Sequence, residues 1–166
     1  MNARTPPVSP TPAEASRDLD AGAASAGSGT AQPTPHTLDL VSMAAPGAVT
    51  GVPGLTVRWP DPGDAAAIAR AATDPDIARW TTLPQPYTEA DAQEFLTELA
   101  PRERAAGRSA MFSIDYRGDY VGACGLHRLE AGETSSIGYW MAPWARGRGF
   151  AGAAVRELSE GGFGKV

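Results

Sequence analysis

The stretch that decides the fold lies at residues 141–158 and reads MAPWARGRGFAGAAVREL. A strand-like run ends at its start, and an alanine-rich pattern with apolar residues three and four apart follows, which predicts a helix. Between them, Arg146, Gly147, Arg148 and Gly149 combine two fixed positive charges with two residues that lack a Cβ. Glycine lets the backbone approach a ligand closely, and the N–H groups of a helix start favour anions. The stretch therefore predicts an anion site at a strand–turn–helix junction.

Strand patterns precede this turn in quick succession, at residues 110–116, 119–129 and 135–142. The connections between them are short, which favours antiparallel hairpins arranged as a meander. Another strand is expected earlier in the chain, at residues 55–60, where apolar and polar residues alternate.

Helices are predicted between the first strand and the meander. Asp61 is an expected N-cap, with Pro62 at the first helical position. Thr88 and Asp91 form a capping-box pair for a second helix, which should end near Pro101. The resulting order is strand, two helices, three strands and a helix, which is a mixed α/β pattern rather than a strictly alternating one.

The first 54 residues differ in composition from the rest of the chain. They contain none of the aromatic residues and 8 of the 15 prolines, and they are otherwise rich in alanine, glycine and serine. A segment without large apolar groups cannot offset the entropy lost on ordering. We expect residues 1–54 to be a disordered tail and residues 55–166 to form the domain.

Composition also argues against several classes of protein. No run of some 18 apolar residues is present and the amino terminus lacks a secretory pattern, so a cytoplasmic protein without a membrane partner is expected. The single cysteine, Cys124, offers neither an internal disulfide nor a metal cluster and is expected to be a buried strand residue. The net charge of -5 argues against a general nucleic-acid binder.

The run from Arg146 to Ala151 fits the pattern of Arg or Gln, two residues, Gly, one residue, then Gly or Ala. This resembles the acyl-coenzyme A signature of the GCN5-related N-acetyltransferases (GNAT family). Residues 135–151 also resemble the fourth-strand segment of the branch that acetylates ribosomal-protein N-termini, and the resemblance runs from Leu55 to about Glu160. It implies the GNAT acyl-CoA N-acyltransferase fold, an α/β fold with a mixed, mainly antiparallel sheet flanked by helices.

The resemblance also implies acetyl-coenzyme A as co-substrate, with no metal. Its pyrophosphate would lie in the glycine-arginine turn and its pantetheine along the end of the fourth strand. An ordinary surface turn or an RNA-binding segment would also fit the turn alone, but its single occurrence between a strand and a helix favours pyrophosphate. The expected cofactor-binding residues are Trp140, Met141, Ala142, Arg146, Gly147, Arg148, Gly149, Phe150 and Ala151.

The activity implied by the family is transfer of an acetyl group from acetyl-coenzyme A to a primary amine, on a protein N-terminus or a small molecule. The amine attacks the thioester directly. No catalytic residue is assigned, because Ser136 stands where the branch often has a glutamate, and serine cannot replace that base. His127 is either a catalytic group or a surface or packing histidine. Of Tyr139 and Trp140, one should pack in the core while the other lines the cleft.

Family members usually continue past the cofactor helix into a fifth strand, a helix with an asparagine and commonly a tyrosine acid, and two more strands. The printed sequence stops at SEGGFGKV, so we expect a partial domain, truncated after the cofactor-binding helix. In order of preference, it is a truncated or frameshifted product, a fragment completed by a partner chain or dimer, or a reduced binding module. Weak turnover is expected, and the alternative function is a non-catalytic acyl-coenzyme A-binding or protein-interaction fragment.

Overall fold

The computed structural model describes residues 44–128 and 135–163. The tail prediction for residues 1–43 therefore lies outside the described residues. The elements are β1 (Gly47–Ala48), β2 (Leu55–Arg58), η1 (Pro62–Asp64), α1 (Ala65–Ala72), α2 (Pro75–Trp80), α3 (Glu89–Glu94), η2 (Phe95–Leu99), α4 (Ala100–Ala105), β3 (Ser109–Tyr116), β4 (Asp119–Arg128), β5 (Ser135–Met141), η3 (Pro143–Ala145) and α5 (Phe150–Phe163).

Within these residues, five strands form one sheet in the order β1-β2-β3-β4-β5, and every neighbouring pair is antiparallel. The predicted meander is confirmed, and β2 to β5 lie within two residues of their predicted bounds. Phe112 lies opposite Cys124, and Gly125 lies opposite Gly138. In the described sheet β5 is an edge strand, next to the glycine-arginine turn.

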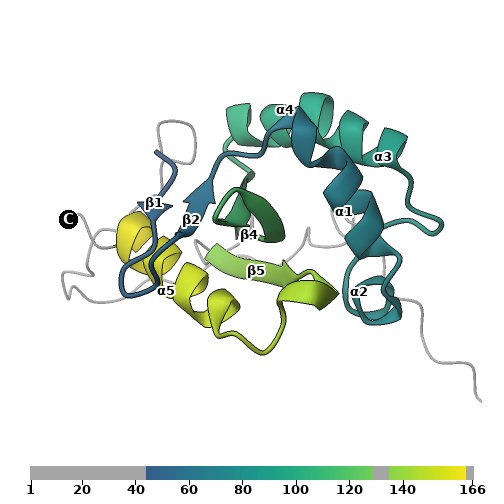
Figure 1. Cartoon of the computed structure of the whole chain (residues 1–166). Helices are drawn as coiled ribbons and strands as arrows, with labels where there is room; N and C mark the ends of the chain where they lie inside the picture. The colour runs from purple at the N-terminus through teal and green to yellow at the C-terminus, as the bar shows by residue number, and fades with distance from the viewer. Residues whose placement is uncertain (1–43, 129–134, 164–166) are drawn as a thin grey trace, which may run out of the picture. The chain divides into compact units, whose positions relative to one another are not determined.

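One face of the sheet is covered by α5 (Figure 1). Alternate residues of β2, β3 and β4 point toward this helix and are almost completely buried, because a strand turns every second side chain to the same face. Fully burying one such side chain contributes about 1.5–3 kcal/mol. The largest of these strand residues are Leu55, Val57, Phe112, Ile114 and Leu126, and Leu158 of α5 is buried with them.

The helices α1 to α4 lie on the opposite side of the sheet from α5 (Figure 1). Ile68 of α1 and Leu96 of η2 are buried there, together with Tyr120 of β4. Ile77 of α2 and Ala142, just after β5, form a smaller buried cluster next to them. This packing brings α2 to the end of β5, where the chain enters the glycine-arginine turn.

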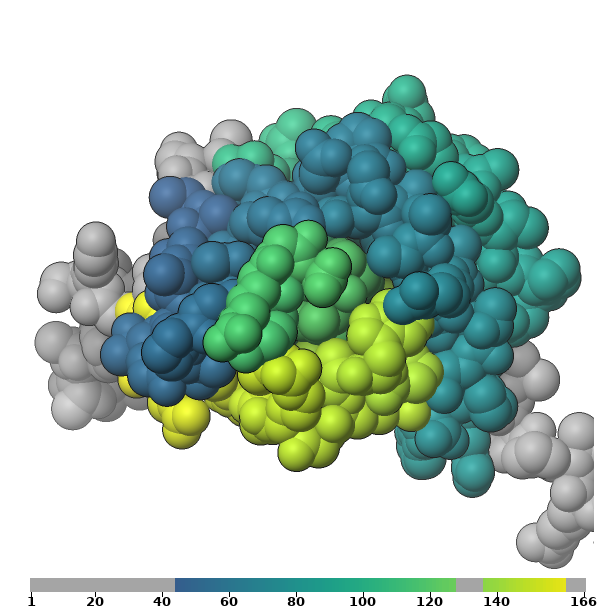
Figure 2. All heavy atoms as spheres, viewed as in Figure 1, coloured from purple at the N-terminus to yellow at the C-terminus, as the bar shows by residue number. Residues whose placement is uncertain are grey.

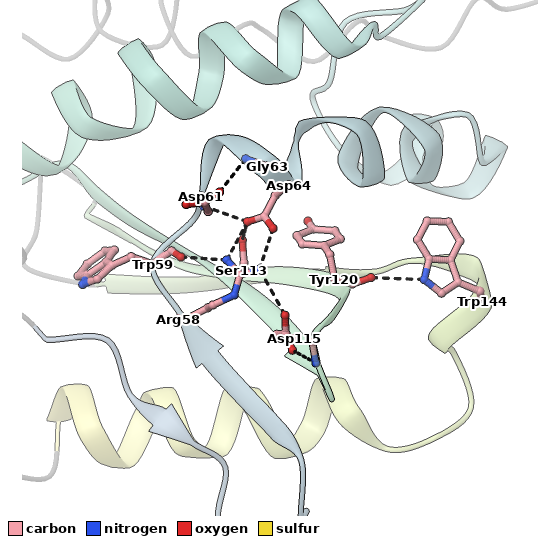
Figure 3. Close-up of polar contacts among 10 residues, drawn as sticks. Arg58, Trp59, Asp61, Gly63, Asp64, Ser113, Asp115, Tyr120 and Trp144 are labelled. Atoms are coloured by element: carbon pink, nitrogen blue, oxygen red, sulfur yellow. Dashed lines mark hydrogen bonds and ion pairs between the residues drawn. The ribbon is translucent and has the colours of Figure 1, made fainter.

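The start of α1 is fixed to the sheet by a polar network (Figure 3). Arg58 donates to both carboxylate oxygens of Asp64, at 2.9 and 2.7 Å, and the Ser113 hydroxyl donates to Asp64 Oδ2 at 2.7 Å. Burial alone would raise the pKa of Asp64, but these donors and the backbone N–H of Asp61 together lower it. The predicted cap at Asp61 is confirmed, with Asp64 completing a capping box.

The structure extends the folded part to the N-terminal side of Leu55. Composition places residues 44–54 in the tail, whereas β1 pairs with β2 and Val49 is buried in the core beside them. The Val49 N–H donates to the Leu55 carbonyl at 2.9 Å and closes the intervening turn. A two-residue strand is too short to produce an alternating pattern, so composition alone assigned it to the tail.

The helical region also differs from the prediction. The Thr88–Asp91 capping box is confirmed, but the helix does not end at Pro101, because a π-helical turn over Phe95–Leu99 precedes it and α4 continues to Ala105. Proline lacks the N–H and clashes with the carbonyl four residues before it in a regular α-helix. The wider π turn changes the local hydrogen bonding, and the helical segment continues past Pro101.

Candidate functional site

The turn between β5 and α5 depends on two glycines. Gly147 and Gly149 have φ values of 73° and 76°, in the left-handed region that other residues rarely adopt. A Cβ built on either glycine would meet no atom within 4 Å. The turn therefore needs glycine for its backbone conformation, and it leaves open space beside the chain.

The N-terminus of α5 opens on the same turn. Its first i→i−4 hydrogen bond runs from the Ala153 N–H to the Gly149 carbonyl, at 3.2 Å. The N–H groups of Phe150, Ala151 and Gly152 precede this first hydrogen bond, and they form the positive end of a 14-residue helix. Phe150 is buried and packs on Tyr116 of β3, with ring centroids 4.7 Å apart. This packing fixes where the helix begins, and so where its positive end points.

The two arginines of the turn have different surroundings. Arg146 Nη2 lies 2.9 Å from Asp74 Oδ1, its Nη1 lies 3.8 Å from Asp76 Oδ2, and its Nε donates to the Met141 carbonyl at 3.3 Å. The hydrogen bond from Arg146 lowers the pKa of Asp74. Arg148 instead lies over aromatic rings. In the described part of the chain we find no carboxylate within 4.0 Å of its guanidinium.

The rings beneath Arg148 are those of Tyr116 and Phe150, each with its centroid 4.5 Å from the guanidinium carbon. This contact is a cation–π interaction and leaves the N–H groups of the guanidinium fork available. Of the two arginines, Arg148 is therefore the one better placed to donate to an added anion.

The end of β5 presents its residues in different ways. The side chains of Met141 and Ala142 are buried, and the Ala142 N–H donates to the Val121 carbonyl at 2.9 Å. Trp140 packs on Tyr120, with ring centroids 5.9 Å apart, whereas Tyr139 is 59% exposed. Of Tyr139 and Trp140, Trp140 is therefore the residue that packs against buried side chains of the core.

A cavity of about 380 Å³ lies between α2 and the end of β5. Most of its wall is apolar or aromatic, and Trp80 at the end of α2 is 77% exposed. In the space-filling view, the yellow-green surface that follows β5 lies against the blue and teal surface of the early helices (Figure 2). The lining residues are Asp76, Ile77, Trp80, Thr81, Tyr139, Trp140, Met141 and Arg146.

Sequence reasoning missed the contribution of α2 to this cavity. The sequence predicts two helices between the first strand and the meander, starting at Asp61 and at Thr88, and none between them, whereas Asp74 caps a six-residue helix with Pro75 at its first position. An aspartate followed by proline is a helix-start signal, the same one that identified Asp61 and Pro62. The signal was present, but six residues are too few to show a helical period.

His127 and Ser136 lie opposite each other on β4 and β5. A Cβ added to Gly138 would lie 3.3 Å from His127 Nε2, so the imidazole lies beside this glycine. Burial lowers the pKa of His127, which keeps the ring neutral at pH 7. Ser136 is exposed. Neither residue lines the cavity, and both interpretations of His127 stay open.

Cys124 is buried in the sheet, as predicted for a strand residue. Burial raises the pKa of its thiol to about 12, so it is not a nucleophile at neutral pH. Within residues 44–128 and 135–163, no group of three or more His, Cys, Asp or Glu side chains could hold a metal ion. The helices of the same residues include none that is both long and apolar enough to cross a bilayer.

Comparisons with known proteins agree with this fold. A probable acetyltransferase of known crystal structure has a TM-score of 0.57 and 25% identity, with 64% of this chain and 62% of that chain covered. RimL, a ribosomal L7/L12 alpha-N-protein acetyltransferase solved in complex with coenzyme A, has a TM-score of 0.55 and 16% identity, with 66% of this chain and 64% of RimL covered. The expected α/β fold, a mainly antiparallel sheet flanked by helices, is confirmed, and every pair of strands in the described sheet is antiparallel.

Sequence comparisons identify the family. An uncharacterized N-acetyltransferase, p20 of Bacillus licheniformis, is 25% identical over 112 residues, which are 66% of this chain. The chain spans 62% of the length of that curated relative. The family described as the acetyltransferase (GNAT) domain matches residues 54–166. Because this match covers well over half of its residues, the chain belongs to the GNAT acetyltransferase family.

Proposed function

We propose that this chain binds acetyl-coenzyme A and transfers its acetyl group to a primary amine. The observation that carries the proposal is the turn at Gly147 and Gly149, where left-handed backbone and open space coincide with the start of α5. A pyrophosphate needs several N–H groups converging on it and a close approach by the chain. RimL, which shares the fold, is known in complex with coenzyme A.

In this proposal, the turn and the first N–H groups of α5 hold the pyrophosphate, and the guanidinium of Arg148 donates to its oxygens. The pantetheine lies along β5 near Trp140 and Met141. In the described sheet, β5 has a neighbour on one side, β4, so its other edge offers backbone groups that an extended amide chain can pair with. Bound acetyl-coenzyme A supplies an activated thioester for acyl transfer.

The acceptor amine enters the cavity between α2 and β5. Ile77, Trp80 and Tyr139 give it an apolar wall, and the Asp76 carboxylate attracts a protonated amine as it approaches. This lining favours an amine carried on an apolar group. The amine loses its proton to water and then attacks the thioester carbonyl. The amide bond forms as the carbon–sulfur bond breaks, and coenzyme A leaves as the thiol with a proton from the amine. Holding the two reactants side by side supplies a large part of the rate.

The proposal is tested in two steps. Calorimetry on the purified chain measures binding of acetyl-coenzyme A, and thiol release is then followed with peptides and small amines that carry apolar or polar groups. We expect saturable binding, and faster thiol release with the apolar amines. A chain without measurable binding would contradict the proposal. Binding without thiol release from any amine would support the non-catalytic alternative.

A further inference from the structure

The carboxylate of Asp74 has two structural roles at once. Its Oδ1 accepts the backbone N–H groups of Asp76 and Ile77, at 3.1 and 3.2 Å, and so caps α2. The same oxygen lies 2.9 Å from Arg146 Nη2, while Oδ2 lies 3.4 Å from Nη1. The side chain of Asp74 is only 16% exposed. One carboxylate therefore joins the first turn of α2 to the glycine-arginine turn.

Arg146 extends this connection to β5. Its Nε donates to the Met141 carbonyl at 3.3 Å, while its terminal nitrogens face Asp74 and Asp76. The guanidinium thus contacts the end of β5 and the start of α2 from within the turn. Both of these elements line the cavity. A displacement of α2 would therefore move Arg146, and with it the backbone that carries Gly147 and Gly149.

We propose that Asp74 is a positioning residue, which acts through Arg146 to hold the cofactor turn in register with α2. The place of coenzyme A in this inference rests on the proposed function. The link between the turn and α2 is independent of it. Arg146 is then a structural arm rather than a phosphate ligand, because two carboxylates already surround its charge. Arg148 supplies the charge that meets the pyrophosphate.

The substitution Asp74→Asn separates the two roles of the side chain. Asparagine is as good an N-cap as aspartate, so the cap of α2 stays, while the charge that holds Arg146 is lost. We expect Asp74→Asn and Arg146→Gln each to weaken coenzyme A binding about threefold, as measured by calorimetry. The double variant should bind coenzyme A about as tightly as the single variant with the lower affinity, since both changes remove the same link.

If Arg146 is instead a phosphate ligand, the change in coenzyme A affinity caused by Asp74→Asn should have the opposite sign. If Arg146 were a phosphate ligand restrained by Asp74, Asp74→Asn would release it and coenzyme A would bind more tightly. Arg146→Gln would then also reduce the salt dependence of binding. Either result would overturn the proposal. Asp76→Asn is the matched control, because its carboxylate lies 3.8 Å from Arg146 and should change binding less than Asp74→Asn does.

A second readout needs no ligand. In amide and indole NMR spectra, Asp74→Asn should shift both the Gly147 and Gly149 amides and the Trp80 indole, since these groups lie on either side of the link. Shifts confined to the first turn of α2 would overturn the proposal. If the unmodified chain failed to bind coenzyme A, the proposed function would fail, and these spectra would still decide whether Asp74 holds the turn.

Discussion

The glycine-arginine turn and the cavity beside it are built in different ways. The turn from Arg146 to Gly149 and the helix after it come from one continuous stretch, and their shape follows from local backbone requirements. The cavity joins α2 to β5, two segments far apart in the chain, and its wall is made of side chains. Local backbone requirements can be seen in a sequence, whereas a wall assembled from distant segments exists only once the chain has folded.

The largest effect is expected from a substitution in the turn. Gly149→Val places a β-branched residue at a φ of 76°, which costs about 1–3 kcal/mol if the backbone holds its position. The added side chain also fills the space in which we place the pyrophosphate. We expect coenzyme A affinity to fall at least about tenfold, as measured by calorimetry.

The control for this substitution is Gly51→Val. Gly51 lies in the turn between β1 and β2, has a φ of 78°, and a Cβ there meets no atom within 4 Å. Valine at this position should strain the backbone by a similar amount and leave coenzyme A affinity unchanged. If Gly149→Val bound coenzyme A as tightly as the unmodified chain, the turn would not be the pyrophosphate site.

An intermediate effect is expected in the cavity. Trp80 is 77% exposed, so Trp80→Ala should cost little stability, but it removes a large aromatic surface from the cavity in which we place the amine. We expect the KM for apolar amines to rise about fivefold, while coenzyme A affinity stays the same. Steady-state kinetics and calorimetry measure the two quantities separately.

Leu99→Ala serves as the comparison for this cavity variant. Leu99 is also an exposed apolar residue, but it lies on η2 and does not line the cavity. Its removal should leave the KM for the amine unchanged. A loss of coenzyme A affinity in Trp80→Ala would mean that the turn and the cavity are one site, and would remove the distinction between them.

The same distinction explains how much of this protein could be predicted. The strands of the meander and the caps at Asp61 and Thr88 depend on near neighbours in sequence, and the structure has them as predicted. The ion pair between Arg146 and Asp74 joins residues 72 positions apart, and no local pattern specifies it. The π turn before Pro101 is local, but it was missed for a different reason, because helix propensity describes regular α-helices.

The smallest effect concerns His127, which lies on β4 beside Gly138 and lines neither the turn nor the cavity. Burial lowers the pKa of His127 below the ordinary 6.5. As the pH falls through 6.5, the unfolded chain therefore binds a proton at this residue more readily than the folded chain does. The stability from keeping His127 neutral is present above pH 6.5 and decreases below it. Asp64 and Asp74 have pKa values lowered from 3.8, so both stay ionised throughout and add no slope there.

We therefore expect urea unfolding to show a lower midpoint at about pH 5.5 than at about pH 7.5, and His127→Gln to reduce this difference. An equal difference in both proteins would show that another group titrates. Thiol release measured over the same range then refines the comparison of the two regions. If the rate falls with the protonation of His127 and the Gln variant loses that dependence, the histidine takes part in the chemistry of the cavity, directly or through water. If only stability follows the titration, His127 is a packing residue of the sheet, and the cavity acts through position and apolar contact alone.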